Sequence, residues 1–174
     1  MAYKIGLLFG IVFCFAADLA AQNPYRMEIF GSLGVAQYAL IPVFGSGGTS
    51  GINVGGGGGV RPFSTDHPAF RSLGVEFESN ITRTSTRFGS QTQGYFTGNL
   101  VLNFPARRVE PYFLIGAGIS HDEGITHRAA DLGGGVRIFL NPHISLRPEF
   151  RAMVTEYLGN IARGSVAIGY HWGH

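Results

Sequence analysis

The sequence carries little charge and almost no lysine. Charged residues make up 14% of its 174 residues, against roughly 25% in an average soluble domain. Of the thirteen basic residues, Lys4 is the only lysine and the others are arginines. The formal net charge of +2 is too weak to indicate a nucleic-acid partner.

Cysteine and helical patterns are also scarce. The only cysteine, Cys14, lies in an apolar run near the start of the chain, so no disulfide is expected in the rest of the sequence. No stretch of useful length repeats its apolar residues with a helical period. The longest apolar run, Ile5–Ala17, is shorter than the roughly 20 residues that a membrane-spanning helix needs.

The first 21 residues have the pattern of an export signal. Met1–Lys4 is a short basic start, Ile5–Ala17 is apolar, and Leu19–Ala21 supplies small residues for cleavage. This order is typical of a secretory signal peptide. We therefore expect a signal peptide at 1–21 and an exported domain at 22–174.

The remaining sequence is dominated by alternation of apolar and polar residues. Between Asn141 and Trp172, for example, Leu146 and Phe150 alternate with the charged Arg147, Glu149 and Arg151. A period of two predicts β-strands, because successive side chains leave opposite faces of a sheet. Such runs are longer than the 5–6 residues typical of soluble strands and suit tilted strands that cross a bilayer. Eight runs are expected: 25–38, 50–61, 72–82, 93–104, 111–120, 128–140 and two within 141–172.

Most charges share one face of these strands, and those of opposite parity, Arg71, Arg83, Arg128 and Glu156, lie only at strand ends. In a membrane barrel that face lines the lumen, where opposite charges can pair, and the apolar face meets lipid. A soluble barrel would place the apolar face inside. The pattern therefore predicts an eight-stranded antiparallel up-and-down transmembrane barrel with a lumen network of arginine and carboxylate side chains. The expected network residues are Glu28, Glu76, Glu78, Arg137, Arg147, Glu149 and Arg151, and Arg61, Asp131 and Arg163 share their parity.

Several other features follow from placing the N-terminus on the periplasmic side. The turns at 62–71, 105–110 and 141–143 then lie at the periplasmic end, and His143 and His171 are expected to face water there.

The glycine runs Gly55–Gly59 and Gly133–Gly135 lack the lysine and helix of a phosphate loop. We expect them to make room for bulky lumen side chains from opposite strands.

The signal peptide, the eight alternating runs and the aromatic last strand resemble the small outer-membrane barrel family of OmpA-type, OmpX-like and opacity-like proteins. The family's terminal insertion signal is similar to the pattern formed by Ser165, Ala167, Tyr170 and Trp172, in which Ala167 occupies the usual glycine position. The resemblance implies outer-membrane location, with lipid and the barrel assembly machinery as partners, and a monomer is expected.

The resemblance implies a structural or surface-interaction role, with a surface ligand that the sequence does not name. A narrow channel and, less favoured, a lipid-modifying enzyme stay open as alternatives. No catalytic residue is predicted, since the His143–Ser145 motif lies at the periplasmic end, away from outer-leaflet lipid. The acidic and histidine residues in 121–127 are interpreted as a solvated loop, so no metal and no other cofactor is expected.

Overall fold

The computed structural model describes residues 25–39, 49–61, 72–86, 89–104, 108–122, 124–156 and 159–173. The predicted signal peptide and the predicted turn at 62–71 lie outside these residues. Within the described part of the chain no helix is long and apolar enough to cross a membrane. The described residues form eight strands: β1 (Met27–Ala39), β2 (Thr49–Val60), β3 (Leu73–Thr86), β4 (Gly89–Asn103), β5 (Val109–Asp122), β6 (Ile125–Phe139), β7 (Ile144–Thr155) and β8 (Gly159–Trp172).

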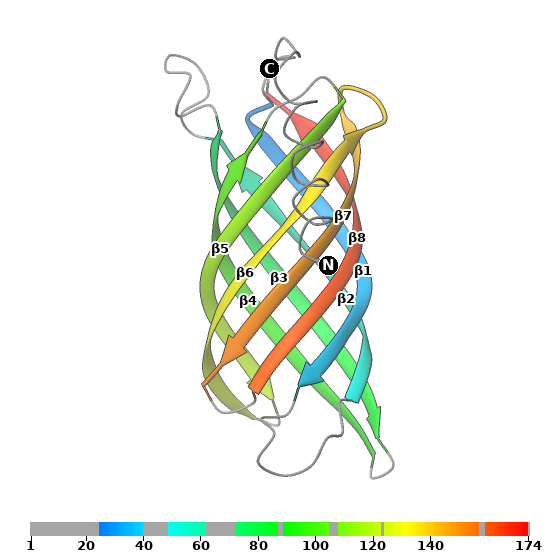
Figure 1. Ribbon diagram of the computed structural model, residues 1–174, viewed down its shortest axis with the longest axis vertical. Helices are drawn as coiled ribbons and strands as arrows, with labels where there is room; N and C mark the ends of the chain where they lie inside the picture. Colours follow the sequence, from blue (N-terminus) through cyan, green and yellow to red (C-terminus); the bar gives the residue numbers. More distant parts are fainter. Residues whose placement is uncertain are drawn as a thin grey trace, which may run out of the picture.

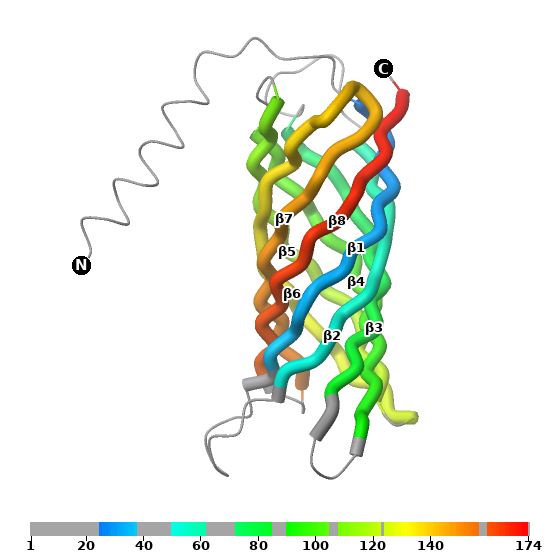
Figure 2. The backbone as a smooth tube through the Cα atoms, turned by 90° about the vertical axis from the view of Figure 1, so that its right-hand side faces the viewer, coloured from blue at the N-terminus to red at the C-terminus, as the bar shows by residue number. Residues whose placement is uncertain are grey.

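The strands close into one antiparallel barrel (Figures 1 and 2). Each strand pairs with the next along the chain, and β8 returns to pair with β1, so that Met27 lies between Val60 and Trp172. Closure removes every free sheet edge, which is what a strand needs inside lipid. We call the end holding Met27 and Trp172 the terminal end, and the opposite end, where Asp122 and Ile125 pair, the hairpin end.

The predicted barrel is confirmed, but several strands are longer than expected. At the hairpin end β3 and β4 continue until Thr86 pairs with Gly89, through a segment expected to be loop. At the terminal end β5 begins at Val109, so Glu110 belongs to a strand rather than to the predicted turn. Hydrogen bonding to a neighbouring strand extends each run past the point where alternation of side chains is visible in the sequence.

The two faces of the wall have opposite chemistry. Ile115 on β5 is 61% exposed, whereas Arg147 on β7 is 1% exposed. This arrangement reverses that of a soluble barrel, because the outward face is apolar and the buried interior is polar. Apolar residues with the outward parity are exposed on all eight strands, and they include Leu33, Ile52, Phe77, Phe96, Phe113, Leu132, Phe150 and Ile168.

Candidate functional site

A continuous network of paired charges fills the lumen from the terminal end to beyond its middle. Among the described residues it joins five arginines to six carboxylates, and every member is buried. All seven residues predicted for the network belong to it. We call this set of eleven residues the ionic section: Glu28, Arg61, Glu76, Glu78, Glu110, Asp131, Arg137, Arg147, Glu149, Arg151 and Arg163.

The centre of the ionic section joins strands on opposite sides of the barrel. Glu76 on β3 forms an ion pair with Arg147 at 3.0 Å and accepts a hydrogen bond from Arg151 at 2.7 Å, both on β7. Arg151 also reaches Glu78 at 2.6 Å and Asp131 at 3.0 Å. Since β3 and β7 lie halfway around the ring from each other, the pairs between them cross the lumen.

The terminal side of the network depends on a carboxylate that was predicted to lie in a turn. Glu110 pairs with Arg61 and, at 3.1 Å, with Arg137. Arg137 also pairs with Glu28 at 3.0 Å. The signal that could have found Glu110 is its parity, since it lies two residues before the inward Tyr112 on β5.

Aromatic rings also pack against the arginines. The Arg147 guanidinium lies 4.1 Å from the centre of the Phe30 ring and 5.0 Å from that of Tyr112. The Tyr112 hydroxyl donates to Glu149 at 2.5 Å. Cation–π contact stabilises a desolvated guanidinium in addition to its ion pairs. The sequence reading missed these aromatic contacts, because alternation shows the face of a residue but not its depth.

Two glycines of β6 provide the space that these large side chains occupy. A Cβ on Gly133 would lie 2.7 Å from Cγ of Arg151 on β7, and one on Gly135 would lie 2.6 Å from the Tyr112 hydroxyl oxygen on β5. The expected role of the glycine run is therefore confirmed. The side chains come from adjacent strands, however, and not from opposite ones.

His171 corrects the prediction that it faces water. It is 0% exposed, and its Nε2 lies 2.7 Å from the Ser145 hydroxyl oxygen. Its ring centre lies 4.2 Å from that of Tyr25 and 5.1 Å from that of Phe139. The reason is parity: position 171 continues the inward face of β8, and the rings of Tyr25 and Phe139 cover it. His143, in contrast, is exposed as predicted.

Towards the hairpin end the lumen is filled mainly by neutral side chains. One side carries amides and hydroxyls, such as Asn53, whose amide donates to the Thr82 hydroxyl at 2.8 Å. The other side is an apolar cluster of Ala36, Tyr95, Ala129, Met153 and Ile161. We call these residues, with Asn80, Thr84, Gln93, Thr97 and Ser120, the neutral section. Asp122, at its outer rim, accepts from Gln91 at 3.3 Å.

The described histidines and acids near the β5–β6 hairpin form no cluster of metal ligands. His121 is exposed and its Nδ1 lies 3.0 Å from the Thr126 hydroxyl oxygen. Within the described residues no three His, Cys, Asp or Glu side chains are placed to hold a metal ion. Glu123 lies outside the described residues.

The residues of the predicted insertion signal occupy both faces of β8. Tyr170 is 49% exposed on the outward face, and its ring centre lies 5.9 Å from that of Trp172. Ser165 and Ala167 are buried on the inward face. The aromatic pair therefore lies on the outward face at the terminal rim, and its part in assembly stays a prediction.

An apolar outer wall, a closed ring of eight strands and a charged, filled lumen define a small transmembrane β-barrel. The family model described as "Outer membrane protein beta-barrel domain" matches residues 5–171. The chain therefore belongs to this family of bacterial outer-membrane barrels. A search of curated protein sequences finds no match.

Solved structures with the same fold include several small barrels. Neisserial surface protein A shares 12% identity, with a TM-score of 0.66 over 89% of this chain and 99% of its own. Ail, the attachment invasion locus protein of Yersinia pestis, shares 16% identity, with a TM-score of 0.54 over 84% and 99%. The outer membrane enzyme PagL shares 12% identity, with a TM-score of 0.51 over 82% and 97%. At these identities the likeness concerns the fold.

Proposed function

We propose that this barrel acts as a closed structural and surface-interaction protein of the outer membrane, and not as a pore. The observation that carries the proposal is the ionic section. Its charges are paired across the lumen, for example Glu76 with Arg147 and Arg151. A permeating ion would have to separate these buried pairs, and leaving one partner alone costs about 3–5 kcal/mol.

The surface role is supported by the exported barrel architecture and by two similar structures whose names refer to the cell surface or to attachment. We place the hairpin end on the outside, with both ends of the barrel domain in the periplasm. A partner would then meet the loops that join the strands at the hairpin end. A closed barrel has no free edge to pair with a second copy, so we propose a monomer.

Planar-bilayer recording of the full-length protein tests the closed lumen. Wild-type protein is expected to give no stable conductance, since the ionic section blocks the path. An Arg147→Ala/Arg151→Ala variant, which removes the two β7 arginines that pair with Glu76 across the lumen, is the positive arm and should raise the frequency of brief openings. A steady current from wild-type protein would support the narrow-channel alternative instead.

An enzymatic role has one geometric feature in its favour. Ser145 and His171 form a close hydroxyl–imidazole pair, and one similar barrel is an outer membrane enzyme. Both residues are 0% exposed, however, and Tyr25 and Phe139 pack over the imidazole. A substrate therefore has no access to the hydroxyl, and we propose a structural role for the pair. Mass analysis of membrane lipids tests this: expression of Ser145→Ala should leave the same lipids as wild-type expression.

We further propose that assembly into the membrane reads the last strand. The outward aromatic pair at the terminal rim supports this. Tyr170→Ala with Trp172→Ala should sharply lower the amount of heat-modifiable protein in the outer membrane. The matched control is Phe77→Ala with Phe96→Ala, which removes a stacked outward pair from β3 and β4. Equal losses in both double variants would show that lipid contact, and not a terminal signal, is what matters.

A further inference from the structure

The outer wall of the barrel is hollowed near the hairpin end of β1, β2 and β3. A groove of about 640 Å³ is lined mainly by apolar side chains, with one polar residue, Ser50, and a single charged one, Arg83. Arg83 is exposed on the outward face of β3, three positions before its last residue, Thr86. Its direct cross-strand neighbours are Ile52 and Thr92, so neither can neutralise the guanidinium.

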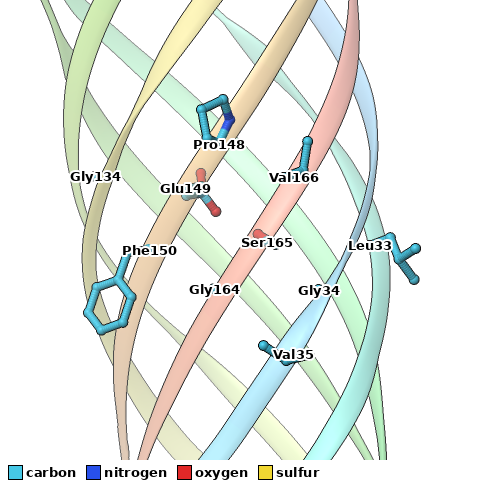
Figure 3. A pocket seen from close by; sticks show the side chains of 10 residues that line it. All are labelled: Leu33, Gly34, Val35, Gly134, Pro148, Glu149, Phe150, Gly164, Ser165 and Val166. Atoms are coloured by element: carbon cyan, nitrogen blue, oxygen red, sulfur yellow. The ribbon is translucent and has the colours of Figure 1, made fainter.

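A second groove, of about 610 Å³, lies on the outward wall nearer the middle of the barrel. Figure 3 shows Phe150 and Leu33 projecting from the wall on its two sides, with the bare backbone of Gly164 between them. A Cβ added to Gly164 would meet no atom within 4 Å. Pro148 and Gly134 also line this groove, and neither carries a long side chain into it.

The two grooves meet at Val35, which lines both. Cross-strand pairing places Arg83, Ile52, Val35, Gly164 and Phe150 side by side on successive strands. With strands spaced by about 4.8 Å, this row is about 19 Å long. It begins near the hairpin end of β3 and reaches the middle of β7, so it runs from the membrane surface towards the membrane interior.

We propose that this row is a binding site for one phosphorylated lipid of the outer leaflet, with the phosphate on Arg83 and an acyl chain along Val35 to Gly164. The assignment to the outer leaflet rests on the orientation proposed above. A guanidinium is suited to a phosphate because its planar fork donates two parallel hydrogen bonds. The apolar floor and the missing side chain at Gly164 suit a hydrocarbon chain.

Arg83 differs from Arg128 in its cross-strand neighbours. Arg128 is also exposed at the hairpin end, on β6. Its cross-strand neighbour is Glu156, whose backbone N–H donates to the Arg128 carbonyl oxygen at 3.2 Å. A carboxylate on the adjacent position competes with an incoming phosphate, whereas Ile52 and Thr92 beside Arg83 do not. Arg128 lines neither groove.

Native mass spectrometry of the full-length protein, delipidated in mild detergent, tests the site with lipid A as the added probe. One lipid A per barrel should be retained. Arg83→Gln and Gly164→Phe should each weaken retention about tenfold, the first by removing a charged donor and the second by filling the groove. The matched controls are Arg128→Gln and Gly31→Phe. Gly31 is outward on β1 and lies outside both grooves, and a Cβ added to it would also meet no atom within 4 Å.

Measurements with other lipids and of dimer formation distinguish this lipid site from other occupants of the groove. Equal retention of zwitterionic phosphatidylcholine would overturn recognition by Arg83, and retention of phosphatidylglycerol without lipid A would overturn the assignment to the outer leaflet. A dimer that Gly164→Phe abolishes would make the groove a contact between copies, and also overturns the proposal. Normal heat-modifiable mobility of all four variants shows that each has folded. Because retention in detergent does not depend on conductance, this site can fail while the closed-lumen proposal stands.

Discussion

The ionic and neutral sections fill the same lumen in different ways. In the ionic section Arg151 contacts four carboxylates, and three of these also contact a second arginine. In the neutral section the Asn53 amide has one side-chain partner, Thr82, and its neighbours across the lumen are apolar. Arg151 thus depends on several strands at once, whereas the Asn53 amide depends on its neighbour on the adjacent strand.

This difference indicates which part of the lumen fixes the relative positions of the strands. An isolated buried charge is far more costly than an isolated buried amide. Glu76 binds arginines from both β6 and β7. A shift in the register of either β-strand would therefore leave the Glu76 carboxylate without one of its partners. The ionic section therefore fixes the relative positions of facing strands, and the neutral section near the hairpin end tolerates more change.

The largest expected effect comes from breaking the ionic section at Arg147. Arg147→Leu removes partners from Glu28, Glu76 and Glu149 together. We expect the free energy of unfolding to fall by about 3–5 kcal/mol, the usual cost of leaving a buried charge without its partner. Urea unfolding in lipid vesicles, followed by fluorescence of Trp172, the only tryptophan, measures the loss.

A double variant sharpens this result. Among the described residues the ionic section holds five arginines and six carboxylates, and Arg147→Leu widens that imbalance by one charge. Adding Glu76→Gln restores the original difference and should recover part of the lost stability. Strictly additive losses would show that Glu76 is sufficiently held by Arg137 and Arg151 alone.

Much of the fold and the membership of the ionic section could be predicted from sequence, because both depend on parity. A residue such as Arg147 faces inward whenever its strand is part of the barrel, and the apolar neighbours decide which face is inward. The alternation within a single strand does not determine which of its residues lie opposite those of the strand across the lumen. The pairing of Glu76 with Arg147 therefore required the closed structure.

The errors also have a physical reason. Glu110 and His171 lie at strand ends, where alternation is short and a turn is an equally good reading. Both are drawn inward by partners from distant parts of the chain: Arg61 and Arg137 for Glu110, and Ser145 and Tyr25 for His171. The lipid-facing grooves were not foreseen, because they depend on which outward side chains are small and adjacent across strands.

A smaller effect is expected from adding one methyl group inside the ionic section. The new Cβ of Gly135→Ala would lie 2.6 Å from the Tyr112 hydroxyl oxygen and 2.5 Å from the Pro148 carbonyl oxygen. Overpacking of this kind costs about 1–3 kcal/mol. The control is Gly94→Ala on the hairpin-end half of β4, where the added Cβ would meet no atom within 4 Å. This change should alter the free energy of unfolding by less than about 0.5 kcal/mol. Similar losses from both changes would mean that strand propensity, and not packing, sets the cost.

The smallest effect is expected in the neutral section. Thr82→Val removes the side-chain acceptor of the Asn53 amide, which keeps only a long contact of 3.4 Å to the Ile81 carbonyl. The cost should be about 1 kcal/mol, the lower end of the range for an unsatisfied buried donor. Asn53→Leu added to Thr82→Val removes both polar partners and also the Asn53 Oδ1, which has no hydrogen-bond partner among the described residues. The double variant should therefore unfold at nearly the wild-type urea concentration. A double variant as unstable as Arg147→Leu would contradict the contrast between the sections, because it would show that the polar side of the neutral section also holds the barrel in register.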